Sequence, residues 1–416
     1  MFLKIMQDCA GWLLMFFNFG IVLIWKRVCS DKKLVYAIWF CIFLHHAVAF
    51  FNAYVGGVIG TEGDAHTLHE FALLGATTEL EIGFLGNPRV CYTNSLALLY
   101  RAFGASSLLG NVLSVSAFTL SCIVLVRLVS LFDLWRFRVG IILLFGLLPS
   151  SVIFSSVTLR EPWQALFFLL SVYWAISLWK RPGILTVSFM LMSAFCMAVL
   201  HNGLKVYAVY LVLFSIYWGI SSHKKGVRLA RSVRFLFAGV IIACVIVLAQ
   251  KVGFFMSAGE GLETAEFFRQ NAATIHGRAT YGGMLDTSSV YGLVTTIPMI
   301  FVQYMFAPFP WQVENGKDVY AFLESMLRFV LLFFAVLFWR RSSGEVRRCY
   351  SFLLIAVLGM ELVWALGTVN WGTGIRHHVP GYGVIVLLGA PGLILFMREL
   401  HSKMLGCRKD NTMLPK

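Results

Sequence analysis

The stretch TEGDAHTLHEFA, from Thr61 to Ala72, places three acidic side chains and two histidines within nine residues. It follows an apolar run that is long enough to cross a membrane, and the chain on both sides of it is mostly apolar. Carboxylates and imidazoles at the mouth of a membrane bundle are costly to bury and are typical of functional sites. We therefore interpret the rest of the chain as a scaffold that holds this stretch opposite Arg-containing loops further along.

The composition is that of a polytopic membrane protein. The 416 residues are 59% hydrophobic and only 13% charged, and the mean hydropathy is +0.79, which excludes an ordinary soluble domain. The net charge is +14, but Lys and Arg cluster in short loops between apolar runs, as the positive-inside rule expects. Because no nucleic-acid-binding motif accompanies this charge, no nucleic acid partner is expected. The nine cysteines are scattered without a CxxC pair and are interpreted as small core residues.

The apolar runs predict an all-α, polytopic transmembrane helix bundle with eleven spans of about 20 residues each. The expected spans are residues 10–25, 34–58, 108–131, 139–159, 163–179, 184–200, 204–220, 235–255, 319–339, 350–366 and 382–396. The basic loops between them are predicted to be cytoplasmic, with the N-terminus outside. These loops are residues 26–33, 132–138, 180–183, 221–234 and 340–349, and the basic tail 398–416 is placed on the same side.

One apolar run breaks the alternation of sides. Leu293–Phe306 is followed by two prolines in the sequence APFPW, and it is short for a span. We expect a re-entrant or interfacial segment, and twelve spans is the alternative. The whole chain, residues 1–416, is then one membrane domain, with a first outer loop at 59–104 and a second at 256–318 that contains this segment.

The strongest candidate functional residues all lie in the predicted outer loops. Asp64 can act as a general base or can hold a divalent cation, Mg²⁺ or Mn²⁺, on a donor phosphate. The alternative is that Asp64 caps a helix that begins near Ala65. His66 and His69 share a helix face, but a third and a fourth ligand for zinc are not evident, so no metal site is assigned.

Two further outer segments carry arginine and histidine. Arg160 and Glu161 end a span in SSVTLREPW, where the guanidinium could bind a pyrophosphate at headgroup depth, or could form a local ion pair with Glu161. In NWGTGIRHHVPG, residues 370–381, glycines allow a ligand to approach the backbone. Arg376 there offers a planar fork, and His377 and His378 offer proton transfer.

Other polar residues are weaker candidates. His201 follows a predicted span, and Arg278 in HGRATYGG could contact a sugar or a phosphate, although a solvated face explains Arg278 equally well. Residues 262–272 are predicted to form a short amphipathic helix. Glu361 and Glu324 are intramembrane acids, and Arg328 is expected to pair with Glu324 four residues before it.

Four motifs in this order resemble a known family. They are GDAxxxHxxA at residues 63–72, PSSVIFSSVTLREP at 149–162, FAPFPWQ at 306–312 and NWGTGIRHH at 370–378. Together they are similar to bacterial polytopic envelope proteins described as membrane glycosyltransferases or O-antigen (exopolysaccharide) polymerases, which are related to the GT-C class. The resemblance implies a GT-C-like fold in the bacterial inner membrane, with the active site facing the periplasm or cell exterior.

The resemblance also implies roles for individual residues. The donor would be an undecaprenyl-linked saccharide and the acceptor a glycan, with membrane lipids and other polysaccharide-assembly proteins as further partners. An Asp in the first outer loop serves the family as base or metal ligand, which corresponds to Asp64, while Arg160, Arg376 and His377 would handle the pyrophosphate and the acceptor. The chain lacks a large soluble outer domain, which favours a polymerase over a protein-modifying enzyme. It also lacks a second acidic motif, which argues against a metal requirement.

Two other functions stay open at this point. A lipid-linked oligosaccharide transporter, or flippase, would more often have an internal repeat and short loops on both sides. A non-catalytic membrane subunit of a polysaccharide export system would explain the bundle, but would not need Asp, Arg and His on one side. We expect Asp64, His69 and His377 to be catalytic, and the expected substrate-binding residues are Arg160, Glu161, His201, Arg278, Arg376 and His378.

Overall fold

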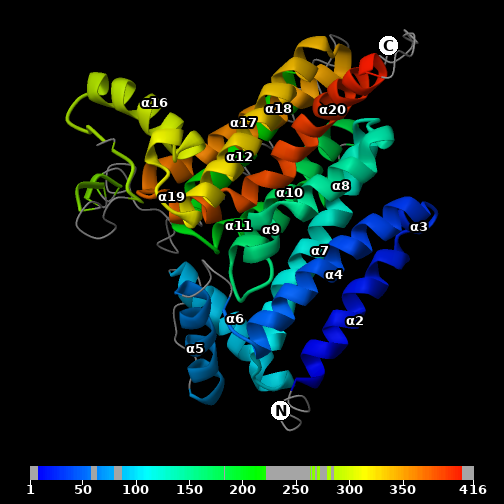
Figure 1. Cartoon of the computed structure of the whole chain (residues 1–416), viewed down its shortest axis with the longest axis vertical. Coiled ribbons are helices and arrows are strands. Elements are labelled where there is room, and N and C mark those ends of the chain that lie inside the picture. Colours follow the sequence, from blue (N-terminus) through cyan, green and yellow to red (C-terminus); the bar gives the residue numbers. More distant parts are fainter. Residues whose placement is uncertain are drawn as a thin grey trace.

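The chain folds into a bundle of helices, seen in a computed structural model (Figure 1). The structure describes residues 8–57, 63–78, 87–181, 183–221, 263, 265–267, 269–271, 279–282 and 285–404, and these contain no β-strand, only an isolated bridge between Thr280 and Asn370. The α-helices are α2 Cys9–Ile24, α3 Lys26–Cys29, α4 Lys32–Tyr54, α5 Asp64–Thr77, α6 Pro88–Phe103, α7 Ser107–Leu131, α8 Arg138–Leu147, α9 Pro149–Phe154, α10 Glu161–Lys180, α11 Ile184–Ala198, α12 Asn202–Ser221, α16 Val290–Phe306, α17 Gly316–Arg341, α18 Gly344–Gly367, α19 Trp371–His377 and α20 Val379–Met404.

Within the described residues, six helices are long and apolar enough to cross a membrane. They are α4, α7, α10, α17, α18 and α20, and four shorter apolar helices accompany them, namely α2, α11, part of α12 and α16. The prediction of an all-helical membrane bundle is therefore confirmed at this level. The count of eleven spans stays a prediction, and the span expected at 235–255, the loop 221–234 and most of the helix expected at 262–272 lie outside the described residues.

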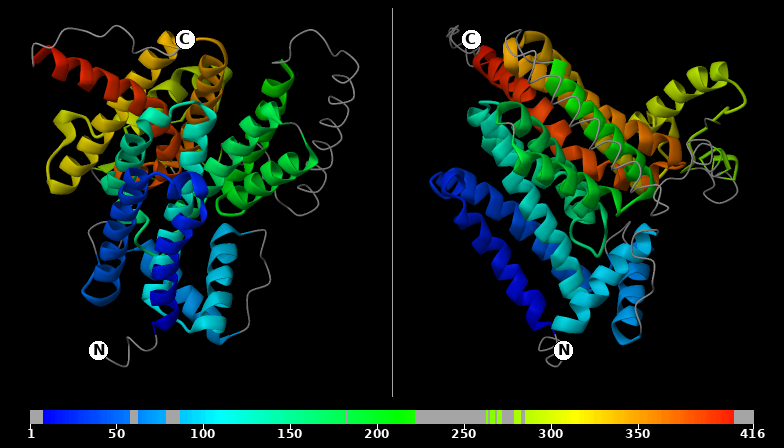
Figure 2. Two further views of the ribbon diagram at one scale, coloured as in Figure 1. Left: turned by 90° about the vertical axis from the view of Figure 1, so that its right-hand side faces the viewer. Right: turned by 180° about the vertical axis from the view of Figure 1, so that it is seen from behind.

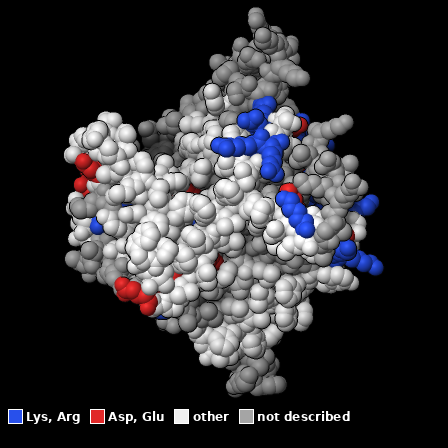
Figure 3. Space-filling view, turned by 45° about the horizontal axis from the view of Figure 1, so that its top comes forward, with Lys and Arg blue, Asp and Glu red and all other residues white. Residues whose placement is uncertain are grey.

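The described parts of the predicted basic loops before α4, after α7, after α10 and before α18 gather at one end of the bundle. Arg138 pairs with Asp31, which joins the loop before α4 to the start of α8. Lys180 lies 3.2 Å from Glu345 and donates to the Leu131 carbonyl oxygen, which joins the ends of α10 and α7 to the start of α18. We call this region the basic end, and Figure 3 shows Lys and Arg side chains gathered on it. The start of α2 and the α5–α6 pair lie at the opposite end (Figure 2).

One predicted span is broken in the structure. Residues 139–159 were expected to form one helix, but α8 ends at Leu147 and α9 begins at Pro149, because proline cannot continue a helix ladder. Residues 155–160 then run as irregular backbone, and residues 155–159 are buried. Side chains satisfy part of it: the Ser156 hydroxyl donates to the His45 carbonyl oxygen, and the Leu159 amide donates to the Ser114 hydroxyl. Irregular backbone at membrane depth requires such protein partners.

The segment expected to be re-entrant or interfacial is helical. It forms α16, which packs against α17 and α18 and contains Pro298. Its 17 residues give a length of about 25 Å, a few ångströms less than a hydrocarbon core of about 30 Å. Whether α16 crosses the membrane stays a prediction.

Replacing Gly389 by alanine should destabilise the contact between α17 and α20. A Cβ atom at Gly389 would lie 2.3 Å from the Leu331 carbonyl oxygen and 2.8 Å from its Cα, so one backbone would have to move. Such overpacking costs about 1–3 kcal/mol. Thermal unfolding in detergent measures the effect, and Gly367→Ala is the control because its Cβ would meet nothing within 4 Å. Equal unfolding temperatures for the two variants would contradict the assigned close packing.

Candidate functional site

Arg376 lies between two carboxylates that come from distant parts of the chain. Its Nη1 donates to Asp64 Oδ2 on α5, and its Nε lies 3.1 Å from Glu161 Oε1 at the start of α10. Arg160 is close enough to interact electrostatically with both Asp64 and Arg376. We call these four residues the Arg376 cluster. Asp64 comes from the first outer loop and Arg376 from NWGTGIRHH, while the LREP motif supplies Arg160 and Glu161.

The Arg376 cluster lies far from the basic end. Glu161 is the first residue of α10 and Lys180 is the last, so the 20-residue helix separates them by about 30 Å, the thickness of a hydrocarbon core. Glu161 and Lys180 therefore mark opposite ends of α10, and the side of the membrane that each end faces stays a prediction.

Local sequence explains how Arg376 and Asp64 are positioned. The Asn370 side chain accepts from the Thr373 amide and caps α19, a helix of seven residues that carries Arg376 in its last turn. This corrects the interpretation of NWGTGIRHH as a loop. Gly374 does not make room for a ligand, because its missing Cβ is where the Tyr281 hydroxyl packs, 2.4 Å from the ideal Cβ position.

Asp64 is not a helix cap. The N-cap of α5 is Gly63, and the carboxylate of Asp64 points to Arg376. Burial alone would raise the pKa of Asp64, but the charge of Arg376, its hydrogen bond and the charges of Arg89 and Arg160 outweigh burial, so the pKa lies below its usual range. The side chain is 43% exposed and ionised near neutral pH.

Two histidines adjoin the cluster and both are neutral. The His201 and His377 rings lie 6.1 Å apart, and the His377 ring stacks on Trp364 at 4.1 Å. Burial, followed by the charges of Arg160 and Arg376, lowers the pKa of His201 to about 3. Burial and the charge of Arg376 also hold the pKa of His377 well below its usual value.

The hydrogen bonds of His377 determine its tautomer. The Thr368 hydroxyl donates its only hydrogen to the Trp364 carbonyl oxygen at 2.7 Å. It must therefore accept from His377 Nδ1, also at 2.7 Å. Nε2 of His377 then carries the lone pair, which is the form that a general base requires.

Several buried polar atoms around the cluster have free hydrogen-bonding capacity. Among the residues that the structure describes, Arg160 Nε, Glu161 Oε2, Gln164 Oε1 and Trp364 Nε1 have no hydrogen-bond partner. Buried polar groups are nearly always paired, so such a concentration is unusual. It suits a ligand rich in hydroxyl or phosphate oxygens.

The other predicted site residues lie elsewhere. His69 lies 2.7 Å from the Tyr100 hydroxyl and 3.3 Å from the Ser107 hydroxyl, which ties α5 to α6 and α7. His378 is buried beside Glu361, with Nδ1 and Oε2 2.6 Å apart. Arg278 lies outside the described residues.

The Arg160–Glu161 ion pair, given as an alternative, and the expected Glu324–Arg328 pair are both replaced by other partners. Glu161 pairs with Arg376 and not with its neighbour Arg160, whose Nη1 donates to the Leu200 carbonyl oxygen. Glu324 and Arg328 are bridged by one hydroxyl: Tyr382 donates to Glu324 at 2.6 Å and accepts from Arg328 at 3.0 Å. In both cases a third chain segment supplies a partner that sequence spacing does not reveal.

Sequence reasoning did not assign Arg89 to the site. Arg89 is exposed at the start of α6. Its charge lowers the pKa of Asp64, although burial and Arg376 have larger effects on that pKa. In the described part of the chain its guanidinium forms no ion pair. In the sequence, Arg89 stands out only as one of the two basic residues in the first outer loop.

No cluster of three or more His, Cys, Asp or Glu that could hold a metal ion occurs among the described residues. The chain matches no family model, no curated protein and no solved structure. The functional argument therefore depends on the Arg376 cluster and its surroundings.

Acidification should destabilise the protein through His201. Its pKa is about 3 in the folded state and about 6.5 when unfolded, so the unfolded state binds more protons between these values. The His201 contribution is complete above pH 6.5 and is lost as the pH falls, by up to about 1.4 kcal/mol per pH unit. Thermal unfolding in detergent at pH 7 and pH 5 measures this loss.

His201→Gln should show a smaller loss between these two pH values than wild type. His66→Gln is the control, because its side chain is 74% exposed. If His201→Gln and wild type lose the same stability, the ring is not held neutral by the fold.

Proposed function

We propose that the chain is a membrane-embedded glycosyltransferase acting on an undecaprenyl-(pyro)phosphate-linked saccharide at the outer face of the bacterial inner membrane, as a polysaccharide polymerase. The observation that carries the proposal is Arg376 held between Asp64 and Glu161 beside Arg160, about one membrane thickness from the basic end. Cations, a carboxylate and neutral histidines at headgroup depth are the groups that a lipid pyrophosphate and a sugar hydroxyl require.

The donor pyrophosphate is assigned to Arg160 and Arg89 first. Arg376 is already neutralised by two carboxylates, whereas Arg160 Nε has no partner among the described residues and Arg89 is exposed. A phosphate oxygen that reaches Arg376 competes with Asp64 for the same guanidinium. Asp64 would then be released next to the donor, with a higher pKa because its strongest favourable charge is shared.

Two groups can take the proton of the acceptor hydroxyl. His377 Nε2 carries a lone pair and is neutral near pH 7, and Asp64 becomes a stronger base when Arg376 turns to phosphate. The Arg side chains stabilise the pyrophosphate leaving group in a site of low dielectric constant. None of these steps uses a metal, and synthesis rates measured with EDTA and with added Mg²⁺ or Mn²⁺ test this feature of the proposal.

The surface-glycan profile of a deletion strain tests the proposal. A polymerase deletion leaves glycan with a single repeat unit, and complementation with wild type restores long chains. Complementation with Arg160→Lys should fail, because the planar fork is lost although the charge stays. Arg101→Lys is the control, a partly comparable arginine in the first outer loop, because among the described residues Arg101 donates to the backbone oxygens of Gly75, Ala76 and Thr78. An unchanged profile in the deletion strain would refute the proposal.

A flippase is the second candidate, favoured by charges inside the bundle. Glu324, Arg328, Glu361 and His378 are all buried within or beside α17, α18 and α20, and intramembrane charges mark transport pathways as well as catalytic sites. A flippase deletion abolishes the surface glycan instead of shortening it to one repeat, so the same experiment separates the two functions.

A further inference from the structure

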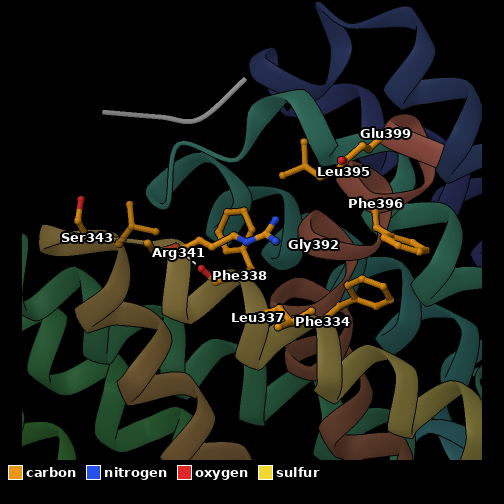
Figure 4. Close-up of a pocket in the computed structure, with 11 residues that line it drawn as sticks. Phe334, Leu337, Phe338, Arg341, Ser343, Gly392, Leu395, Phe396 and Glu399 are labelled. Atoms are coloured by element: carbon orange, nitrogen blue, oxygen red, sulfur yellow. Dashed lines mark hydrogen bonds between the residues drawn. The ribbon is translucent and has the colours of Figure 1, made fainter. Parts of the chain in front are cut away.

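A pocket between α17 and α20 opens at the basic end, far from the Arg376 cluster. It has a volume of about 110 Å³. Its walls are mostly aromatic and aliphatic, formed by Phe334, Leu337, Phe338, Val346, Leu395 and Phe396. Figure 4 shows Phe334, Leu337 and Phe338 on α17 and Leu395 and Phe396 on α20, whereas Val346 belongs to α18. The Phe334 and Phe396 rings lie 5.2 Å apart. Both helices are candidate membrane spans, so the apolar walls continue into the hydrocarbon region.

The mouth of the pocket is positively charged. The Arg341 side chain extends from α17 toward α20 (Figure 4), and within the described residues its guanidinium has no ion pair. Ser342 and Ser343 line the same mouth, directly before α18. The Ser343 hydroxyl does not cap α18, so the amides of the first turn of that helix remain open to an anion.

Neighbouring carboxylates do not cancel this charge. Glu399, which also lines the pocket, lies 3.2 Å from Lys403. Glu345 in the first turn of α18 lies 3.2 Å from Lys180. Arg341 is therefore the cation at the mouth that is available to an incoming ligand.

We propose that this pocket binds an anionic phospholipid of the membrane leaflet at the basic end. Its phosphate would lie on Arg341 and the two serines, and the upper part of an acyl chain would lie against Phe334 and Phe396. Phe396 is 50% exposed, so the apolar wall is open to the bilayer on one side. Basic pockets between membrane helices on the side of the basic loops bind such headgroups. A free anion would use the charged mouth but would leave the apolar wall uncovered.

Lipid binding to the full-length protein tests this assignment. Delipidated protein in detergent is titrated with phosphatidylglycerol, phosphatidylcholine or inorganic phosphate, and bound lipid is counted by native mass spectrometry. We expect wild type to prefer phosphatidylglycerol over phosphatidylcholine by about fivefold or more, because the choline ammonium offsets the phosphate charge of the zwitterionic lipid, and the attraction of one arginine to an anionic lipid corresponds to about that factor. Arg341→Gln should lose this preference. Arg340→Gln should keep it, because Arg340 is an exposed arginine one residue away that does not line the pocket.

Three results would overturn the proposal. The first is an unchanged preference in Arg341→Gln. The second is an equal loss in both arginine variants, which would indicate a general basic surface. The third is protection against thermal unfolding by inorganic phosphate alone that matches the protection by phosphatidylglycerol, which would indicate a free anion. All three are independent of glycan synthesis, so the proposed function can fail while this site stands.

Discussion

Arg376→Gln is expected to abolish glycan synthesis and to destabilise the protein by about 3–5 kcal/mol, as does the removal of one partner from a buried ion pair. The Glu161 side chain is only 3% exposed and lies 3.1 Å from Arg376 Nε. Its second oxygen has no hydrogen-bond partner in the described residues. Without Arg376, the buried carboxylate would lose the cation 3.1 Å away and keep only its electrostatic contact with Arg160. Thermal or denaturant unfolding in detergent, together with the surface-glycan profile, measures both effects.

The double variant Glu161→Gln with Arg376→Gln separates stability from function. It removes both buried charges, so most of the lost stability should return. Glycan synthesis should stay absent, because the guanidinium is still missing. Arg376→Lys should keep part of the stability through its charge but should remain inactive, since one ammonium cannot reach Asp64 and Glu161 with the geometry of a guanidinium. Active Arg376→Lys at a normal protein level would show that only the charge matters.

Hydropathy predicted most of the helices because the bilayer allows few alternatives. A spanning segment must satisfy its own backbone, so a long apolar run is a helix. Residues 108–131 and 163–179 were placed within two residues of the ends of α7 and α10. The prediction of one span at residues 139–159 was wrong for two reasons. Apolarity alone does not show that the helix breaks before Pro149. It also does not show that α4 and α7 supply hydrogen-bond partners for the irregular backbone after α9.

The sequence indicated which residues belong to the candidate site better than it indicated which of their charges form ion pairs. Assigning each loop to a side was enough to place Asp64, Arg160 and Arg376 together, although Asp64 and Arg376 are 312 residues apart. The partner of each charge depends on helix packing, which periodicity does not determine. His69 has the same spacing and chemistry as a catalytic residue, but the hydroxyls of Tyr100 and Ser107 hold its ring in the contact between α5, α6 and α7.

Replacing Asp64 by asparagine should lower the rate of glycan synthesis by about 10²–10⁴, the contribution of a general base or of a group that orders the donor. Stability should change little, by less than about 1 kcal/mol, since the side chain is 43% exposed and water screens its pair with Arg376. Asn has nearly the shape of Asp and can still accept from Arg376, but it has no charge and takes no proton. Rates with purified protein and lipid-linked saccharide measure the effect. Glu70→Gln, with a 53% exposed carboxylate on the same helix, is the control.

The comparison of Asp64→Asn with Asp64→Ala decides between chemistry and positioning. If Asp64 only orients Arg376, the amide oxygen of Asn preserves the hydrogen bond, and synthesis is lost only in Asp64→Ala. If the carboxylate charge or basicity is needed, both variants are inactive at normal protein level. Activity in Asp64→Asn would transfer the role of base to His377, whose Nε2 lone pair is already directed by Thr368. In that case His377→Gln should be the variant that loses synthesis while Arg376, Asp64 and Glu161 keep their pairing and the protein keeps its unfolding temperature at pH 7.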